Sequence, residues 1–547
     1  MRRSIVTEGA KLHWSETVAP LLAGAIGVAV KLYEITGEDE YKANAFYFAE
    51  KGKATLLLES FSEVSARRIV GIPDSLLDQE RTLYAEVMGH EQRLREIPGG
   101  ESGRLSEEIN RRQRQVFELN RRREALIAYL EHAYPDYFDL KYNIEVARPE
   151  DVQRVGLDEE TAIVEYVLGE QDIFIFTITS TEINVTSQAK DSNLEHQITE
   201  LRRGIIEQDY ELYTVYAHLL YNQLLKEVVD ENQVSNLVII PDGVLNYVPF
   251  EALLTRDIAN SVSTKDYRSL PYVIKRFAVS YAYSATLRTE TIQRSRPEPP
   301  KDYLAFAPVF RGGVPVGTWG ADLLNDSGKI DSADVNGRLG YLARTRSEVT
   351  DIRKLFTRRY GLLERLLSRK TQVYLEENAT EARLKTVALD EYRYVHFATH
   401  GFASDTNQEA SGILLFPHEG STEGSSEEAD SVHEDGVLRV DEVYNLKLNA
   451  DLVVLSACET GLGPIARGEG VLGLTRGFLY AGSSNVLVSL WKADDIQTSQ
   501  LMPDFYRSLL RGMGMPSALR AAKLTLIQAN SRYARPFYWA PFVLVGA

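Results

Sequence analysis

The chain has a single cysteine, Cys458, among its 547 residues. One cysteine cannot form a disulfide within the chain, which indicates a reducing compartment and predicts a cytoplasmic protein. A lone cysteine in a chain that also contains histidines is a candidate nucleophile, although a cysteine on a buried strand is often an inert core residue. Cys458 therefore has two interpretations at this point, a reactive thiol or a packing residue.

An excess of positive charge is also absent, because the net charge is −17 at pH 7. A surface of this sign repels the phosphates of nucleic acids and of anionic lipids. We therefore expect no nucleic-acid partner and no anionic-membrane partner for the surface as a whole.

Long apolar runs are missing as well. The residues after the basic N-terminus, 5–14, do not form the continuous apolar core of a signal peptide. The most apolar stretch, 18–30, contains Pro20 and is shorter than the roughly 20 residues that a helix needs to cross a bilayer. The sequence thus predicts no membrane association.

The usual residues of a zinc site are not found either. The chain has no second cysteine, and no HExxH motif accompanies its histidines. His396 and His400 are four residues apart on a predicted strand, a separation of about 13 Å, which is too long for two ligands of one metal ion. We expect no metal at this pair, and His396 is predicted to be a core residue.

The first part of the chain has the periodicity of helices. Residues 15–65 contain many alanine, leucine and tyrosine residues with a break at 36–39, so region 1–72 resembles a tetratricopeptide-like (TPR-like) helix pair. In region 73–140, Leu83 and Val87 lie on one apolar stripe and Leu119, Leu126 and Leu130 on a second, which predicts a long antiparallel helical hairpin with a turn at 98–103. That hairpin either extends the repeat surface or serves as an arm that binds a partner protein.

After residue 135 the pattern changes to strands that alternate with helices. This alternation predicts mainly parallel sheets flanked by helices. The proline-rich segment 295–300 separates two such units, 145–294 and 301–547. Within the second unit, the acidic stretch 419–435 is either a solvated insertion or a mobile flap near the functional site.

Two apolar strands of the second unit end on chemically competent residues. Segment 393–401 ends on His400 and Gly401, and segment 450–461 runs through Cys458. Carboxyl ends of strands are where open α/β sheets place their sites, and an imidazole beside a thiol promotes the reactive thiolate. The two strand ends therefore predict a Cys-His dyad for acyl transfer, in which the N–H groups of Gly401 and Cys458 stabilise an oxyanion.

Several motifs in order resemble the CHAT family of caspase-like cysteine proteases, relatives of separases that often follow tetratricopeptide repeats. They are His-Phe-Ala-Thr-His-Gly at 396–401, Leu-Ser-Ala-Cys-Glu-Thr-Gly at 455–461, Gly-Glu-Gly-Val-Leu-Gly-Leu at 468–474 and Leu-Trp-Lys-Ala-Asp-Asp at 490–495. Further upstream, Pro-Asp-Gly-Val-Leu-Asn-Tyr at 241–247 resembles the family's first half. The resemblance covers about 145–547.

This resemblance implies an α/β caspase-like domain with a pseudo-protease half, 145–294, and an active half, 301–547. It implies His400 as general acid/base, Cys458 as nucleophile and the amides of Gly401 and Cys458 as the oxyanion hole, with no metal or cofactor. The Leu-Trp-x-x-x-Asp motif also resembles a separase segment that implies Asp495, with Asp494 beside it, in an S1 pocket for a basic P1 residue. The alternative is that Asp495 or Asp494 caps the next helix.

Two functions are consistent with these features. The first is a regulated intracellular endopeptidase that cleaves protein substrates and is controlled through a regulatory protein docking on the N-terminal helices. The second is a non-catalytic scaffold that uses the helical region and the caspase-like fold for protein assembly. The family resemblance adds the expectation of a bacterial protein with a role in defence or programmed death.

Overall fold

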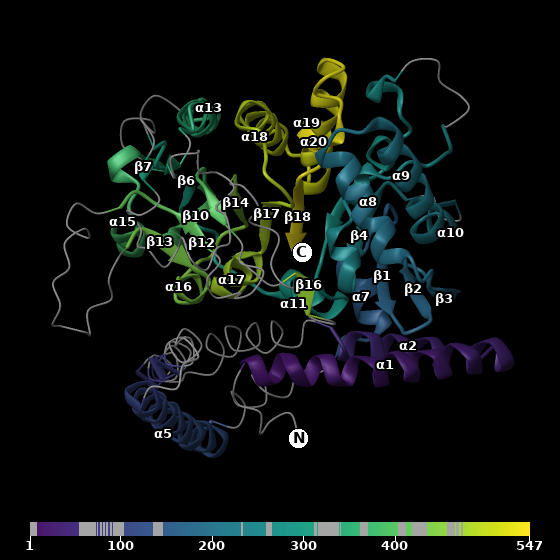
Figure 1. The fold of residues 1–547 in the computed structure, drawn as a ribbon, viewed down its shortest axis with the longest axis horizontal. Helices are drawn as coiled ribbons and strands as arrows, with labels where there is room; N and C mark the ends of the chain where they lie inside the picture. Colours follow the sequence, from purple (N-terminus) through teal and green to yellow (C-terminus); the bar gives the residue numbers. More distant parts are fainter. Residues whose placement is uncertain are drawn as a thin grey trace.

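The computed structural model of the chain is shown in Figure 1. It describes residues 8–53, the positions 73, 75–76, 79, 82–83, 86–87 and 90, and residues 103–134, 146–230, 234–258, 265–310, 314–315, 338–339, 341–360, 370–402, 412–417, 435–456, 465–466, 470–471 and 474–546. The stretch 419–434, the turn at 98–102 and Cys458 lie outside the described residues.

One sheet of eleven strands runs through both α/β units, in the order β3-β2-β1-β4-β5-β18-β17-β14-β10-β6-β9. In the first unit β1, β4 and β5 are parallel, and β2 and β3 extend the sheet as antiparallel neighbours. The bounds of these strands are β1 (Thr161–Leu168), β2 (Asp172–Ile178), β3 (Ile183–Ala189), β4 (Asn236–Ile240) and β5 (Ala278–Tyr281).

The second unit contributes five strands that are parallel to one another. Their residues are largely apolar without alternation, as expected for strands covered on both faces. The bounds are β6 (Lys301–Ala307), β9 (Thr371–Leu375), β10 (Tyr392–Phe397), β14 (Leu452–Leu455) and β17 (Asn485–Ser489).

The last strand of the chain, β18 (Phe542–Gly546), joins the two units. It pairs antiparallel with β17 over five residues and parallel with β5 through Val545 and Tyr281. The strands of the two units therefore run in opposite directions across the β17–β18 pair. At the end of β18, a side chain on Gly546 would meet the backbone oxygen of Ser484 at 2.3 Å, so this close pairing requires glycine.

Helices cover both faces of this sheet (Figure 1). The helices on one face form the main core with the sheet. Alternate residues of β1, including Ala162, Val164 and Tyr166, belong to this core. The helices of this layer are α8 (Leu194–Ile206), α9 (Tyr210–Leu224), α13 (Thr345–Thr357), α18 (Asp495–Leu509), α19 (Met515–Ala529) and α20 (Pro536–Trp539). The opposite side carries α7 (Pro149–Gly156), α11 (Ala285–Gln293), α16 (Val440–Tyr444) and α17 (Leu474–Ala481).

The all-α region precedes the α/β part, as predicted. Helices α1 (Glu8–Thr36) and α2 (Glu40–Lys51) form an antiparallel pair that turns at Gly37 (φ 73°), and Ile26 and Phe46 pack on Ile163 and Phe174 of the sheet. The intervening β1 residues thus face α1 and α2, on the side opposite α8 and α9. The pair is docked on the first unit, below it in Figure 1.

By length and composition, one segment of α1 could cross a membrane. Val18–Thr36 comprises 19 residues with a mean hydropathy of 1.6, and 22% of it is buried within the protein. It is longer than the run 18–30 on which the sequence prediction rested. Core helices of water-soluble proteins meet the same criterion, and here Ile26, Ala29 and Val30 are buried against α2 and the sheet.

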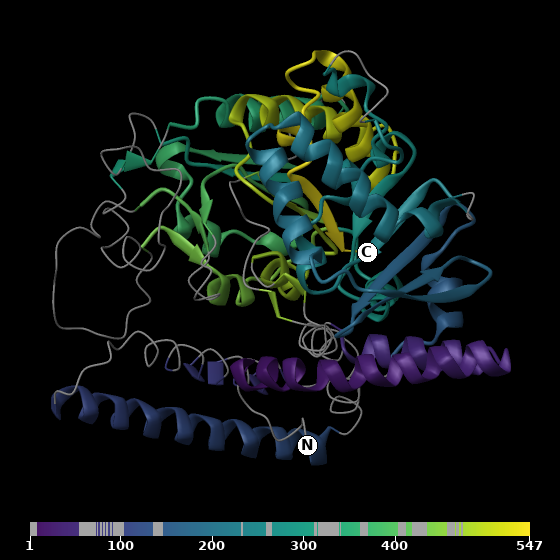
Figure 2. The same cartoon turned by 45° about the vertical axis from the view of Figure 1, so that its right-hand side comes forward.

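A second long helix, α5 (Gly103–Ala133), lies on the same side of the molecule as α1 (Figure 2). Leu119, Leu126 and Leu130 of α5 form a buried cluster with Leu83 and Val87. These are residues of the apolar stripes from which the helical hairpin of region 73–140 is predicted.

Candidate active site

The strands that lead to His400 and Cys458 are direct neighbours. Parallel pairing of β10 with β14 brings Phe397 opposite Leu455, and the N–H of Ser456 donates to the carbonyl of Phe397 at 2.8 Å. In the sequence His400 follows Phe397 by three residues, and Cys458 follows Leu455 by three. Cys458 itself lies outside the described residues, so the dyad stays a prediction, whereas the adjacency of the two strands is observed.

After Phe397 the chain leaves the large sheet and enters a small one. This three-stranded sheet consists of β11 (Gly401–Phe402), β12 (Gly412–Leu414) and β13 (Val437–Arg439), in that order. The hydroxyl of Thr399 donates to the carbonyl of Leu414, and the N–H of Leu414 donates to the carbonyl of His400 at 2.9 Å. His400 is therefore held at the junction of the two sheets by its backbone.

The His400 side chain is 3% exposed, and its ring stacks on Phe310 with centroids 5.6 Å apart and an interplanar angle of 24°. Phe310 follows β6, the other neighbour of β10, and both Val309 (φ 63°) and Phe310 (φ 51°) are in the left-handed region. Such a backbone is unfavourable for bulky residues and is often retained at functional sites. The stacking fixes the plane of the imidazole.

Sequence reasoning did not identify Phe310. The available signal was its place directly after a strand end, in Pro308-Val309-Phe310, but no motif distinguishes this aromatic residue from others in the chain.

Gly401 follows His400 in the chain and is the first residue of β11. It pairs with Ile413 of β12. Its backbone is buried and fixed by this pairing. The predicted contribution of its N–H to an oxyanion hole stays a prediction, as does the contribution of Cys458.

His396 is a core residue with two partners. Its Nε2 is 3.0 Å from a carboxylate oxygen of Glu348 on α13, and its Nδ1 is 3.3 Å from the hydroxyl of Tyr506 on α18. Both His396 and Glu348 are essentially inaccessible to solvent. Burial raises the pKa of Tyr506 well above its usual value, and the charges of Tyr394 and Glu348 add to this shift. These contacts hold β10 against α13 and α18.

The two acids of the predicted S1 pocket have different surroundings. Asp494 is the N-cap of α18, and its Oδ1 accepts from the N–H groups of Ile496 at 3.0 Å and Gln497 at 3.3 Å. The capping alternative thus describes Asp494.

Asp495 is the first residue of α18, and its Oδ2 accepts from the N–H of Arg344 at 2.9 Å, at the start of α13. Burial raises the pKa of Asp495, while this hydrogen bond opposes the rise. An S1 role for either acid stays a prediction.

Comparison with known proteins identifies the second part of the chain. A family model described as the CHAT domain matches residues 214–547. The match begins at residue 214, whereas the sequence motifs predicted a resemblance from about residue 145. Strands β1 to β3 precede the match but belong to the same sheet. Tetratricopeptide repeat protein 28 of Mus musculus and that of Homo sapiens are each 30% identical over 194 residues, which are 31% of this chain and 8% of theirs. The chain thus spans less than a tenth of these relatives.

Among solved structures, the separase–securin complex of Saccharomyces cerevisiae matches 93% of this chain and 41% of its own, with 9% identity and a TM-score of 0.41. The Arg-specific cysteine proteinase gingipain R matches 65% of this chain and 74% of its own, with 10% identity and a TM-score of 0.33. The family match covers more than half of the chain, from within α9 to the C-terminal residue, and it includes every strand of the second unit. On this match, the chain belongs to the CHAT-domain family.

Proposed function

We propose that this protein is a regulated cytoplasmic cysteine endopeptidase with Cys458 and His400 as its catalytic dyad. The observation that carries the proposal is the parallel pairing of β10 with β14, in which Phe397 and Leu455 are opposite each other and each precedes a dyad residue by three positions. Parallel strands in this register deliver equivalent following residues to the same end of the sheet.

The reaction follows from the chemistry of these groups. His400 accepts the proton of the Cys458 thiol, and the thiolate attacks the carbonyl carbon of the scissile peptide bond. The amides of Gly401 and Cys458 stabilise the resulting oxyanion. His400 then gives its proton to the leaving amine as the C–N bond breaks, which leaves a thioester on Cys458. A water molecule, deprotonated by His400, attacks the thioester and regenerates the thiol with release of the carboxylic acid.

Stacking on Phe310 supports this role for His400. A ring whose plane is fixed loses little orientational freedom when it transfers a proton, so more of the substrate's binding energy is available for the transition state. We assign Asp495 to recognition of a basic P1 side chain, because a partly buried carboxylate attracts a cation more strongly than an exposed one.

Regulation through the N-terminal helices is supported by a contact beyond Cys458. The strands β15 (Ile465–Ala466) and β16 (Gly470–Val471) form an antiparallel pair that follows Cys458 in the chain. Both lie against η2 (Gly243–Tyr247) of the first unit, and β15 also lies against α1. A displacement of α1 would therefore reach the segment that follows the nucleophile.

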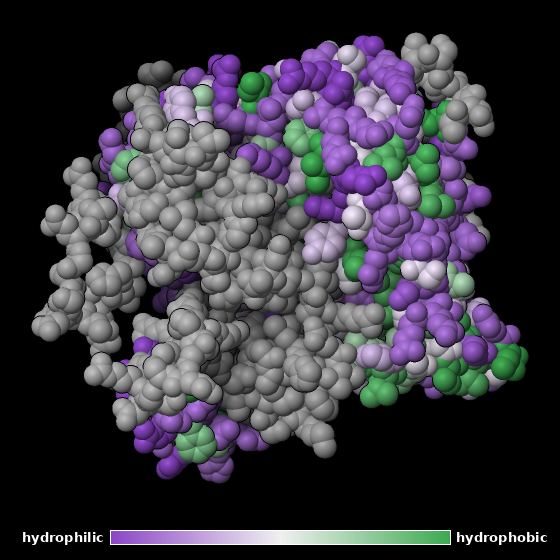
Figure 3. Space-filling view, in the orientation of Figure 1, coloured by the Kyte–Doolittle hydropathy of each residue, from purple (hydrophilic) through white to green (hydrophobic). Residues whose placement is uncertain are grey.

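The exposed side of α1 supports a docking partner. Leu21, Val28 and Ile35 repeat every seven residues and are 72%, 61% and 81% exposed. Seven-residue spacing aligns them on one face of the helix, as in helices that pack against another helix. Figure 3 shows hydrophobic residues gathered at the lower right of the molecule, where the α1–α2 pair lies in Figure 1. We propose that an activating protein binds this face with an amphipathic helix.

The test is cleavage of a diverse peptide library by the full chain, alone and with candidate activators, in comparison with Cys458→Ala. We expect cleavage that the variant loses, with lysine or arginine before each cut. Equal cleavage by Cys458→Ala would exclude the dyad, and activity-independent assembly by both proteins would favour the scaffold function.

A further inference from the structure

A buried cluster outside the dyad joins helix α15 (Glu381–Thr386) to the small sheet. The carboxylate of Glu381 is 1% exposed; one oxygen accepts from the N–H of Gly436 at 2.9 Å and the other from Nζ of Lys385 at 2.5 Å. Lys385 also donates to Glu442 of α16 at 2.8 Å. Two carboxylates thus share one ammonium group.

This cluster holds both ends of β13. Gly436 immediately precedes the strand, and its N–H is bound by Glu381. At the other end, the N–H of Arg439 donates to the second oxygen of Glu442 at 2.9 Å. The position of β13 therefore depends on Glu381 and Glu442 together.

From β13 the connection continues to the dyad histidine through β12. Ile413 of β12 pairs with Leu438 on one side and with Gly401 on the other. The next residue, Leu414, donates its N–H to the carbonyl of His400 at 2.9 Å. The chain just before α15 also holds the chain just after β12, because the N–H of Phe416 donates to the carbonyl of Ala379 at 2.9 Å.

We propose that Glu381 is a positioning residue of the active site: with Lys385 and Glu442 it fixes β13, and through β12 it sets the position of His400 and Gly401. This inference rests on the proposed function of the His400 site. No residue of the cluster contacts substrate in this proposal.

The cluster changes its charge near neutral pH. Burial and the negative charge of Glu442 raise the pKa of Glu381, the hydrogen bond from Lys385 opposes the rise, and the resulting pKa is about 7. Burial lowers the pKa of Lys385, but its bonds to both carboxylates outweigh this effect and raise it, so Lys385 stays charged. Arg439 and Asp435 form a further charged pair at β13, at 2.7 Å.

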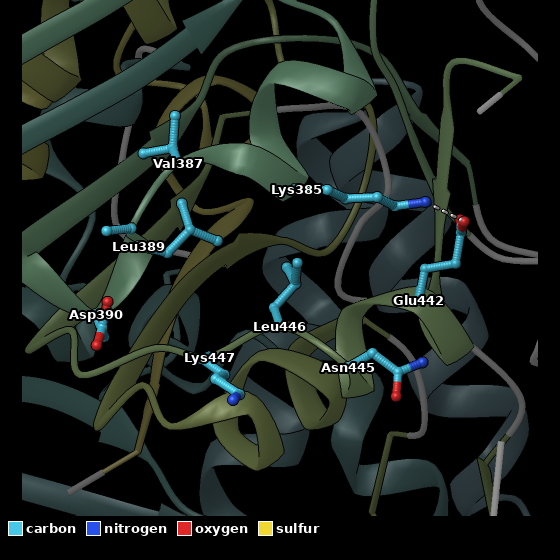
Figure 4. A pocket seen from close by; sticks show the side chains of 9 residues that line it. Lys385, Val387, Leu389, Asp390, Glu442, Asn445, Leu446 and Lys447 are labelled. Carbon is cyan, nitrogen blue, oxygen red and sulfur yellow. Dashed lines mark hydrogen bonds and ion pairs between the residues drawn. The ribbon is translucent and has the colours of Figure 1, made fainter. Parts of the chain in front are cut away.

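The net charge of the cluster depends on whether Glu381 carries its proton. Below pH 7 Glu381 is neutral, and the charges of Lys385 and Glu442 cancel. Above pH 7 the cluster carries a net charge of −1 in a largely buried place, which is unfavourable. A cavity of about 500 Å³ is lined by Lys385 and Glu442, the two partners of Glu381 in this cluster (Figure 4). Because the folded pKa of Glu381 is raised, its stabilising contribution is complete below about pH 4.5 and is lost as the pH rises through about 7.

Cys458 is the only cysteine of the chain, so a thiol reagent reports on the site alone. We propose to measure the rate of Cys458 alkylation by iodoacetamide between pH 5.5 and 9 in the full-length parent, Glu381→Gln and Glu442→Gln, with His400→Ala as the reference for a lost dyad. Glutamine at 381 keeps an acceptor for Gly436 but does not titrate.

We expect the parent profile to contain an inflection near pH 7 in addition to that of the thiol. Glu381→Gln should lack this inflection, and Glu442→Gln should shift it to lower pH by about one unit, because the neighbouring charge is gone. A purely structural role would change unfolding but leave the three profiles superimposed, which would overturn the proposal. Circular dichroism checks that each variant is folded, and Glu442→Gln keeps the test decisive if Glu381→Gln does not fold.

Alkylation needs no peptide cleavage. A parent that cleaves as much as Cys458→Ala, alone and with activators, yet shows the Glu381-dependent inflection, would refute the endopeptidase and retain the positioning role. Peptide cleavage together with superimposed alkylation profiles would retain the endopeptidase and refute the positioning role of Glu381.

Discussion

The two α/β units differ in how they use the polar groups that follow their central strands. In the first unit, Lys53 follows α2 and donates to the carbonyls of Ile240 and Pro241 at the end of β4, at 3.4 Å and 3.1 Å, and Asp242 accepts from the N–H of Leu168 at 2.8 Å. In the second unit, β10 leads to His400 and Gly401, which a small separate sheet holds. The first unit uses its strand-end polar groups for structure, and the second presents them beside the strand that leads to Cys458.

Each unit also contains two carboxylates beside one lysine, all three buried in the first unit and only Glu381 fully buried in the second. In the second unit these are Glu381, Glu442 and Lys385. In the first they are Glu50, Glu165 and Lys53, and Glu50 accepts from the N–H groups of Ala285 at 2.9 Å and Thr286 at 2.6 Å, at the start of α11. Buried charge thus attaches the N-terminal helices to the first unit and the small sheet to the second. The desolvation cost of a buried charge is offset only where hydrogen bonds accompany it.

The largest effect should come from the strand ends themselves. We expect His400→Ala to reduce kcat/KM by about 10³-fold, because the thiolate and the leaving amine both lose their proton partner. Asp242→Ala is the matched change in the first unit, and it should leave kcat/KM of the folded protein within about twofold while it lowers stability by about 1 to 3 kcal/mol. A large loss of activity in Asp242→Ala would contradict the division of roles.

The attachment of the N-terminal helices should depend strongly on Glu50. Glu50→Ala leaves two buried N–H groups of α11 without their acceptor, so we expect a loss of about 3 kcal/mol in the free energy of unfolding, measured by urea denaturation. Glu34→Ala, an exposed acid on the same helix pair, serves as the control and should change it by less than about 0.5 kcal/mol. Equal effects would show that the pair is held by apolar packing alone.

The two neighbouring acids of α18 should separate stability from specificity. Asp494→Ala removes an N-cap and should cost about 1 kcal/mol, whereas Asp494→Ser should retain most of the stability because serine also caps. If Asp495 lies in the S1 pocket, Asp495→Asn should reduce cleavage after lysine and arginine and leave capping intact. Product sequencing with the peptide library separates these outcomes.

The smallest change at neutral pH should be Glu165→Gln. Burial raises the pKa of Glu165 well above its usual value, and the charge of Glu50 adds to the rise, which favours the neutral acid that glutamine resembles. At pH 7 we expect the free energy of unfolding to change by less than about 1 kcal/mol. As the pH rises through the raised folded pKa, the parent loses stability that the variant keeps, so their urea midpoints should diverge with increasing pH. Parallel midpoints at all pH values would place the titration elsewhere.

Local patterns were enough for much of this fold. Apolar runs located the strands that became β10 and β14, the break at 36–39 located the turn between α1 and α2, and the leucine stripe of α5 predicted its buried face. Such features depend on residues within a few positions of one another, so they can be read from a single sequence.

The sequence by itself determined the family, the α/β class with an all-α region before it, and the strand ends that carry His400 and Cys458. Only the tertiary structure decided that β18 joins the two units, that Phe310 stacks on His400, that Glu381 supports the small sheet, and that α1 and α2 dock on the first unit. Each of these depends on partners far apart in the chain, as with Glu50 and Ala285, which are 235 residues apart. No local periodicity records such a pair, because the free energy of the contact arises only when folding brings both groups out of water together.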